Sequence, residues 1–300
     1  HLSLRRQRQM CIRDSCYPFE TERGQEDTED MFTPGTFTAE VTGAATLTFW
    51  ASLEPIGSID WDAELAKRQQ QINADAAPTP TQQRLRRAAS DFVVLKQRDE
   101  HQTGTTLLAG YPWFGEWGRD AMVSLPGLLL YTGRHLEAGR VLSLFAEHVS
   151  EGLIPHVFDD RTGEPHYNCV DASLWFVNAV FEYLKHTKDQ DTFESILLPA
   201  CRQIVDAYIN GTRYDIKVDA NDGLLTQGDP TTQLTWMDTK TNGVIFTPRH
   251  GKAVEVNALW YNALRLMSDH QLADKVADSF RRAFYISPVS YTHLTLPTKA

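Results

Sequence analysis

The sequence predicts a mainly α-helical fold preceded by the last strands of a β-sandwich domain. Between residues 59 and 284, apolar residues recur with helical spacing in one segment after another. Several of these segments end at Gly or Asn-Gly, where helices commonly stop. Motifs rich in aromatic and charged residues fall in alternate connections between the segments. This pattern favours an α/α toroid, in which two concentric rings of helices leave a site at one end, over a plain four-helix bundle.

The β-domain is predicted from residues 32–53, where Thr and aromatic residues alternate around a turn at Gly43. Two strands do not fold alone, so the rest of that sheet is expected upstream. Residues 16–57 are therefore assigned to the end of a β-sandwich domain, and residues 58–286 to a partial α/α-toroid domain. Helices of the second domain are predicted at residues 59–76, 79–98, 120–131, 135–150, 170–186, 191–209, 255–267 and 271–284.

Both ends of the chain differ from its middle. Residues 1–15 are rich in Arg and are followed at once by an acidic run. They lack the apolar stretch and the cleavage site of a secretory signal. Residues 6–15 and 288–298 resemble translated sequencing adapters, so residues 1–15 and 287–300 are expected to be non-native.

Composition excludes several classes of partner. With 300 residues, 42% of them hydrophobic, the chain can bury a large core. Its formal net charge of −10 disfavours nucleic acid, whose phosphates the average surface would repel. No apolar run approaches the roughly 20 residues that span a bilayer, so no membrane partner is expected. The four cysteines show no metal-binding spacing and favour a reducing, cytoplasmic location.

Residues 111–120 carry the strongest functional signal. They combine Trp113 and Trp117 with Arg119 and Asp120, and Gly and Pro residues lie between them. Aromatic rings pack on the C–H face of a sugar, while a guanidinium and a carboxylate donate to and accept from its hydroxyls. The motif therefore predicts a sugar site. The alternative is a core turn with a surface ion pair.

A second signal lies in the long segment 215–252, which exceeds an ordinary connection and is typical of a functional loop. Asp238 follows Trp236 in this segment, and an indole packed on a carboxyl group excludes water and raises its pKa. A protonated carboxyl group can act as a general acid on a glycosidic oxygen. The alternative is that Asp238 caps the next turn. Residues 219–223 resemble a calcium loop but have Gly at the wrong position, so a turn is predicted.

Other candidates favour structural roles. His156 and His166 are ten residues apart on a loop, which is a poor spacing for a metal pair, so hydrogen-bonding or surface roles are expected for both and no metal is predicted. Trp175 is expected in the core. For Trp260, core packing and a contact to glucan at the rim of the site both stay open.

Five ordered motifs carry a resemblance to a known family. They are Trp117-Gly118-Arg119-Asp120, Gly152-Leu153-Ile154-Pro155, Tyr167-Asn168-Cys169-Val170-Asp171-Ala172, Leu234-Thr235-Trp236-Met237-Asp238, and Thr247-Pro248-Arg249 with Glu255-Val256-Asn257-Ala258-Leu259-Trp260. Together they resemble the C-terminal amylo-α-1,6-glucosidase domain of glycogen debranching enzymes. The resemblance covers roughly residues 32–284.

This resemblance implies an (α/α)6-toroid glycoside hydrolase that inverts configuration, needs no cofactor and acts on a glycogen- or starch-type α-glucan. It implies that Arg119 and Asp120 hold the hydroxyls of the nonreducing glucose and that Asp238 is the general acid. Trp113, Trp117 and Trp236 are expected to contact substrate. Asp171 and Glu255 lie inside matching motifs, but each also opens a helix, so they are expected in substrate contact or structural roles before a role as base.

Inversion needs a second carboxylate, about 6.5–9.5 Å from the acid, as general base. The family's base lies well downstream of the Trp-Met-Asp motif, so this chain is expected to be a fragment that is inactive by itself. Two other functions stay open. One is an α-glucosidase of the trehalase or glucoamylase type, and the other is a noncatalytic glucan-binding module.

Overall fold

A computed structural model describes residues 13–16, 18, 28–31, 38–44, 60–74, 79–97, 103–110, 114–159 and 162–285. The chain divides into two compact units. The first comprises residues 1–74 and 239–246, and the second comprises residues 75–238 and 247–300.

The described residues of the first unit form short antiparallel hairpins and one helix. Strand β1 (Arg13–Cys16) pairs antiparallel with β2 (Thr28–Met31), and α2 spans Trp61–Ala74. The short strands β9 (Lys240–Thr241) and β10 (Val244–Ile245) form a second antiparallel hairpin. Of the hairpin predicted at residues 32–53, only residues 38–44 are described, and the backbone bends at residues 42–44. The rest lies outside the described residues, so the β-sandwich stays a prediction.

The second unit is mainly helical and carries every motif of the predicted sugar site. Its helices are α3 (Pro80–Asp91), α4 (Gly118–Leu125), α5 (His135–Glu147), α6 (Asp171–Thr187), α7 (Gln190–Thr192), α8 (Leu198–Asn210), α9 (Val254–Leu266) and α10 (His270–Phe284). Wide π-helical turns form η1 (Pro126–Leu130) and η2 (Phe193–Leu197), and η3 (Arg213–Asp215) is a 3-10 turn. Antiparallel hairpins join β3 (Val93–Gln97) to β4 (Thr103–Leu107), β5 (Val157–Phe158) to β6 (Pro165–His166), and β7 (Lys217–Val218) to β8 (Leu225–Thr226).

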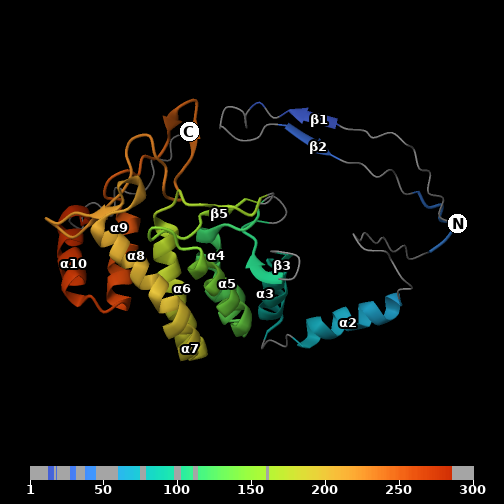
Figure 1. Ribbon diagram of the computed structural model, residues 1–300. Coiled ribbons are helices and arrows are strands. Elements are labelled where there is room, and N and C mark those ends of the chain that lie inside the picture. Colours follow the sequence, from blue (N-terminus) through green and yellow to red (C-terminus); the bar gives the residue numbers. More distant parts are fainter. Residues whose placement is uncertain are drawn as a thin grey trace. The chain divides into compact units, whose positions relative to one another are not determined.

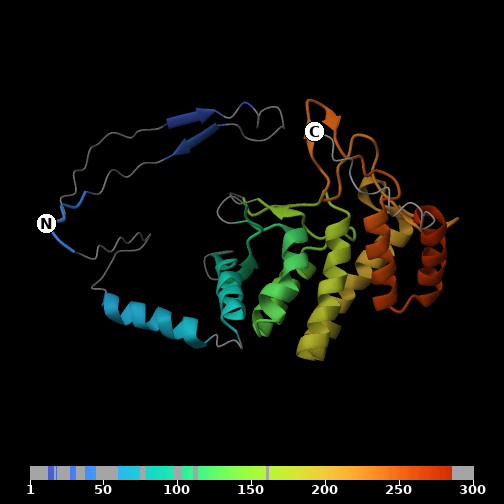
Figure 2. The same ribbon diagram turned by 180° about the vertical axis from the view of Figure 1, so that it is seen from behind.

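Helix α6 packs between α4 and α9, and all three begin at the same end of the unit, the upper end in Figures 1 and 2. The side-chain amides of Asn178 and Asn262 are hydrogen-bonded across α6 and α9, with an N···O distance of 3.1 Å. Each Asn lies seven residues after an acidic residue in the first turn of its helix, Asp171 or Glu255. The two helices are therefore parallel and in step. Helices α5, α8 and α10 run back towards that end (Figure 1).

The core lies between these helices, and Trp260 is the largest fully buried side chain among the described residues. Trp260 is fully buried, and its indole N–H donates to the carbonyl of Gly223 over 3.2 Å. Core packing is thus the correct alternative for Trp260, because its ring cannot reach a ligand. Trp175 is partly buried and packs against the same core, as predicted. None of the helices in the described part of the chain has both the length and the apolar character that crossing a membrane requires.

The predicted helix ends are largely confirmed where glycine marks them. Gly133 follows η1 with a φ of 80°, and Gly211 follows α8 with a φ of 97°, conformations that favour glycine. Gly152 also has a positive φ, of 78°, but α5 has already ended at Glu147, so the predicted end of that helix was wrong.

Two local features differ from the predicted helices. The helix predicted at 79–98 ends at Asp91, and residues 93–97 form β3 instead, because two consecutive β-branched Val residues favour a strand that pairs with β4. The helix predicted at 120–131 becomes π-helical from Pro126. Proline has no N–H for the regular ladder, and Tyr131 donates to the Pro126 carbonyl, five residues back, over 2.9 Å.

The turn predicted at residues 219–223 is present, and a lysine side chain lies against it. The ammonium of Lys252 lies 2.6 Å from Asp219 and 2.7 Å from Asp222. This contact holds the pKa of Asp219 below its usual value. Gly223 has a φ of 77° and closes the turn by donating to the carbonyl of Asp219 over 2.7 Å. The two carboxylates thus bind a cation that belongs to the chain itself.

Candidate active site

The start of α4 is held against the strand β5. Gly118 donates its N–H to the carbonyl of His156 over 2.8 Å, and Trp117 forms a β-bridge with Val157. A Cβ atom at Gly118 would collide with the carbonyl oxygen of Pro155, so glycine is needed for this close approach. The close approach at Gly118 therefore determines the position of the backbone from which the side chains of Arg119 and Asp120 extend.

Trp117 lies half-buried just before α4, between two other rings. Its indole meets the His156 imidazole edge to face, with ring centroids 4.9 Å apart, and the Phe114 ring at 6.2 Å. Phe114 is 54% exposed. These rings form an aromatic surface at the end of the unit where α4 begins. Trp113 lies outside the described residues, so its predicted contact stays a prediction.

Arg119 and Asp171 form a buried ion pair between the first turns of α4 and α6. The Nε atom of Arg119 lies 2.8 and 3.0 Å from the two carboxylate oxygens of Asp171. The side chains are only 14% and 3% exposed. Because both partners are charged and largely shielded from water, this interaction is strong and fixes the orientation of the guanidinium.

A thiol contacts both members of this ion pair. Cys169 lies between the two charged groups: its Sγ–H donates to Asp171 over 2.8 Å, and Arg119 donates from Nη2 to Sγ over 3.0 Å. Burial, followed by the nearby carboxylate of Asp171, raises the pKa of the thiol far above its usual value. Cys169 is therefore a neutral hydrogen-bonding link and not a nucleophile.

Asp120 follows Arg119 and is exposed as a residue in the first turn of α4. The surrounding protein still removes part of the hydration of its carboxyl group, which is the largest cause that raises its pKa, and Arg119 opposes the shift. Glu255 occupies the corresponding place in α9, where it accepts a hydrogen bond from Arg249 over 2.8 Å. Asp120, Asp171 and Glu255 thus occupy the first turns of three helices that begin at one end, where helix dipoles favour negative charge.

The burial of His156 at this end differs from what the sequence predicted. It was expected to bond to a partner or lie at the surface, but it is 6% exposed, and its Nδ1 has no hydrogen-bond partner within the described residues. Burial, assisted by the charge of Arg119, lowers its pKa to about 4. The imidazole is therefore neutral near pH 7, and it supports the aromatic surface without adding charge.

The long loop is anchored beside α6 and α9 by backbone contacts. Val170 donates to the carbonyl of Leu234 over 2.9 Å, which places the Leu-Thr-Trp-Met-Asp motif next to the start of α6. At the other side, the buried amide of Asn257 accepts from the N–H of Leu225 at 2.7 Å and donates to its carbonyl at 3.0 Å. Gln227 pairs through its backbone with Gly251. The loop is therefore held at the same end as the ion pair.

The motif's acidic residue does not have the environment predicted for it. Trp236 is 57% exposed and Asp238 is also exposed, so the indole does not bury the carboxyl group as the sequence analysis expected. Leu234 and Thr235 are buried, and exposure to solvent begins with Trp236. The predicted burial of Asp238 was therefore wrong, and its role as acid stays a prediction.

Sequence reasoning missed the partners of the acidic residues. Cys169 and Arg249 were quoted inside motifs without a role, although each contacts a predicted site residue. Arg249 precedes Glu255 by six residues, so a short-range pairing could have been considered. The contact of Cys169 with Arg119 joins residues fifty positions apart and leaves no local signal.

The arrangement suits a ligand rich in hydroxyls. It offers aromatic faces, a fixed guanidinium, one exposed carboxylate and two carboxylates already paired with arginines. Among the described residues, no group of three or more His, Cys, Asp or Glu side chains is placed to hold a metal ion.

Comparisons with known proteins place these motifs in a family. A family model described as amylo-alpha-1,6-glucosidase matches residues 87–295. The glycogen debranching enzyme of Saccharomyces cerevisiae is 28% identical over 220 residues, which cover 54% of this chain and 14% of the yeast protein. The chain thus spans only a small part of that relative.

Among solved structures, a rhamnosidase from Klebsiella oxytoca with rhamnose bound aligns with a TM-score of 0.38 and 17% identity, over 55% of this chain and 33% of that one. This similarity is too low to support an argument about the site. The family match, in contrast, covers more than half of the chain and takes in all five motifs. The chain belongs to the amylo-alpha-1,6-glucosidase family.

Proposed function

We propose that this chain forms part of an α/α-toroid glucosidase domain that hydrolyses α-1,6-linked glucose at the branch points of a glycogen- or starch-type α-glucan. One observation carries the proposal: in a member of this family, the first turns of α4, α6 and α9 bring acidic residues to one end, beside a fixed guanidinium and an aromatic surface. The parallel, in-step packing of α6 and α9 is what an inner ring of a toroid requires.

The residues of α4 are assigned to binding of the nonreducing glucose. Arg119 donates to sugar hydroxyls from the side of its guanidinium that does not face Asp171, and Asp120 accepts from them. Asp171 and Cys169 act behind Arg119, where they hold its orientation. Trp117 supplies an aromatic surface for the C–H face of the sugar. Trp113 and Trp236 are assigned further contacts to the glucan.

Asp238 is assigned as general acid of an inverting mechanism. It is exposed here, and we assign the exclusion of water around it to Trp236 and the bound sugar. Neither Asp171 nor Glu255 is assigned as base, because each already binds an arginine. The base is placed in a part of the protein outside this chain, as the resemblance implies.

The reaction needs no cofactor in this proposal, since protonation of the leaving oxygen and activation of water are both done by carboxyl groups. We also propose a cytoplasmic location. Cys169 and Cys201 are both free and buried, which is typical of proteins from a reducing compartment.

The test is the Asp238→Asn substitution in the complete reading frame that contains this chain. An amide cannot deliver a proton, so hydrolysis of a branched α-glucan should fall roughly 10²- to 10⁴-fold. Hydrolysis of glucosyl fluoride should fall much less, because fluoride leaves without protonation. Asp206→Asn, an exposed carboxylate on α8, is the matched control and should leave both rates unchanged.

The outcomes separate the alternatives. An equal loss for both substrates would show that Asp238 has another role in the site. If no variant of the site changes any rate and the complete protein still binds glucan, the chain is a noncatalytic binding module. A preference for α-1,1- or α-1,4-linked glucose over the branch linkage would instead indicate a trehalase or glucoamylase type.

A further inference from the structure

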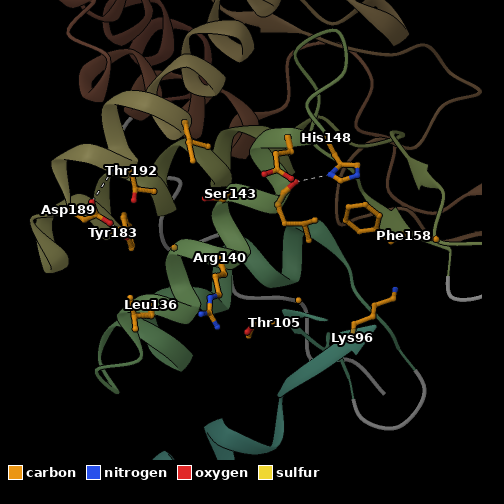
Figure 3. Close-up of a pocket in the computed structure, with 16 residues that line it drawn as sticks. Lys96, Thr105, Leu136, Arg140, Ser143, His148, Phe158, Tyr183, Asp189 and Thr192 are labelled. Atoms are coloured by element: carbon orange, nitrogen blue, oxygen red, sulfur yellow. Dashed lines mark hydrogen bonds between the residues drawn. The ribbon is translucent and has the colours of Figure 1, made fainter. Parts of the chain in front are cut away.

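A groove of about 820 Å³ runs along α5, and none of the residues assigned to the candidate site lines it. Its floor is one face of α5, where Leu136, Arg140, Ser143 and Glu147 follow one another at spacings of three or four residues. At 1.5 Å rise per residue, this face extends roughly 16 Å. The groove is therefore long enough to take an extended ligand and not just a single small molecule (Figure 3).

The floor presents polar groups that the protein does not use. Within the described part of the chain, Arg140, Ser143 and Glu147 make no hydrogen bond through their side chains. Helical serines elsewhere behave differently, since Ser124 and Ser195 each donate to the carbonyl four residues earlier, both over 2.6 Å. The hydroxyl of Ser143 is thus free to bond to a ligand, between a guanidinium and a carboxylate.

One wall of the groove is rigid and rich in oxygen atoms. Tyr183 donates its O–H to Asp189 over 2.6 Å, and the same aspartate accepts from the backbone N–H of Thr192 and caps α7. A Cβ atom at Gly139 would press on the Tyr183 hydroxyl, so glycine at this position gives the tyrosine room. Thr192 and Asp189 both face the groove in Figure 3.

The end of the groove towards β5 is aromatic. The rings of His148 and Phe158 meet edge to face with centroids 5.2 Å apart. His148 Nδ1 lies 2.9 Å from the carbonyl of Leu144 and must carry the proton of that bond, which leaves Nε2 as an acceptor when the imidazole is neutral. On the opposite wall, Thr105 and Lys96 come from the hairpin β3–β4 (Figure 3).

The charges that line the groove cancel. Lys96 and Arg140 are balanced by Glu147 and Asp189. An anionic ligand such as a phosphate or nucleic acid would meet these carboxylates, and an apolar helix would leave the polar floor without partners. An uncharged ligand with many hydroxyls fits both the balance of charge and the alternation of donors and acceptors, and an aromatic ring is available for its C–H face.

We propose that the α5 groove is a second glucan-binding site, which holds a linear stretch of the same polysaccharide whose branch is cleaved at the candidate site. The proposal rests on the proposed function for its choice of sugar. Strand β5 joins the two sites: Val157 bridges to Trp117, and the next residue, Phe158, lines the groove. Successive residues of a strand face opposite sides, so β5 separates the two ligands by the thickness of one strand.

The experiment measures binding of maltoheptaose, a linear glucan without a branch, to the complete protein by calorimetry. An Asp120→Ala background weakens the candidate site, so the remaining binding reports on the groove. Arg140→Ala in this background should weaken binding about tenfold, as expected for loss of a charge-assisted hydrogen bond. Ser143→Trp should abolish it by filling the groove. Arg202→Ala, an exposed arginine on α8, is the matched control.

Two further measurements distinguish the possible failures. Arg140→Ala should leave hydrolysis of glucosyl fluoride unchanged and lower kcat/KM for a long branched glucan. If the proposed function is wrong, neither the wild type nor any variant should hydrolyse these substrates. The groove proposal would be overturned if the Arg140→Ala variant bound maltoheptaose as tightly as the Arg202→Ala control does. Unchanged glucan binding together with a lowered melting temperature in Ser143→Trp would also overturn it, and would assign the groove to a polypeptide segment.

Discussion

The ion pair between Arg119 and Asp171 allows a quantitative test of how the two helix starts are held together. Asp171→Ala removes the acceptor of the Arg119 contacts of 2.8 and 3.0 Å and of the Cys169 thiol, and leaves a guanidinium that is 14% exposed without its carboxylate. Breaking a buried pair on one side costs about 3–5 kcal/mol. Because some water reaches Arg119, we expect the lower end of this range, about 3 kcal/mol. That is a large share of a typical domain stability of roughly 5–15 kcal/mol.

Hydrogen–deuterium exchange by mass spectrometry can measure this loss inside the complete protein, peptide by peptide. A loss of about 3 kcal/mol corresponds to roughly 100-fold faster exchange in peptides from α4 and α6. The double variant Arg119→Met/Asp171→Ala should recover part of the protection, because it leaves no buried charge unpaired. Glu182→Ala, which breaks an exposed pair with Lys185, should change exchange by less than a factor of about three.

The reasoning would be refuted if Asp171→Ala changed the unfolding free energy of the α4 and α6 peptides by less than about 1 kcal/mol, no more than the exposed control. It would be refuted as well if the double variant were less protected than the single one. In that case the guanidinium would be stabilised by groups other than the carboxylate.

The remaining predictions concern pH and close packing. His156 has a pKa lowered from 6.5 to about 4, so the unfolded chain binds a proton between these values and the folded chain does not. Its contribution to stability is therefore complete above pH 6.5, and roughly 3 kcal/mol is lost as pH falls to about 4. His156→Gln should make the free energy of unfolding, measured in urea, depend less on pH over this range than in wild type. Equal pH dependence in the two proteins would contradict the assignment. Gly118→Ala should displace the start of α4 from Pro155, destabilise the protein by about 1–3 kcal/mol and raise KM for every glucosyl substrate. Gly127→Ala, with open space around the new methyl group, should be neutral or slightly stabilising, and a similar loss in both variants would refute the packing argument.

Much of the helical unit could be predicted because its signals are local. The period of apolar residues located α6, α9 and α10 to within a residue or two at each end, and Asn210-Gly211 marked the end of α8 correctly. Each of these signals lies within one or two turns of the structure it specifies. Residues 93–97 were predicted as the end of a helix but form β3. Their local sequence allows either structure, and pairing with residues 103–107 favours the strand.

The candidate site could be predicted only by residue type. Arg119 and Asp120 were found from their motif, but the motif did not reveal that Arg119 binds Asp171 on the neighbouring helix while Asp120 stays exposed. Likewise, the order Trp236 then Asp238 in the sequence suggested burial, but two side chains separated by one residue on a loop need not contact each other. Partners and burial are set by packing between segments far apart in the chain, which a single sequence does not encode in its spacing.

The lysine that lies against the turn at residues 219–223 has a consequence for how this protein responds to its surroundings. A loop that relies on calcium is ordered only while the ion is abundant, and a chelator disorders it. Here the ammonium of Lys252 is tethered to the same chain, so its effective concentration is fixed by covalent geometry and does not vary with the ionic composition of the cell. Lys252 lies two residues before α9, so the turn and the start of that helix are kept in register by an internal counterion that a chelator cannot remove.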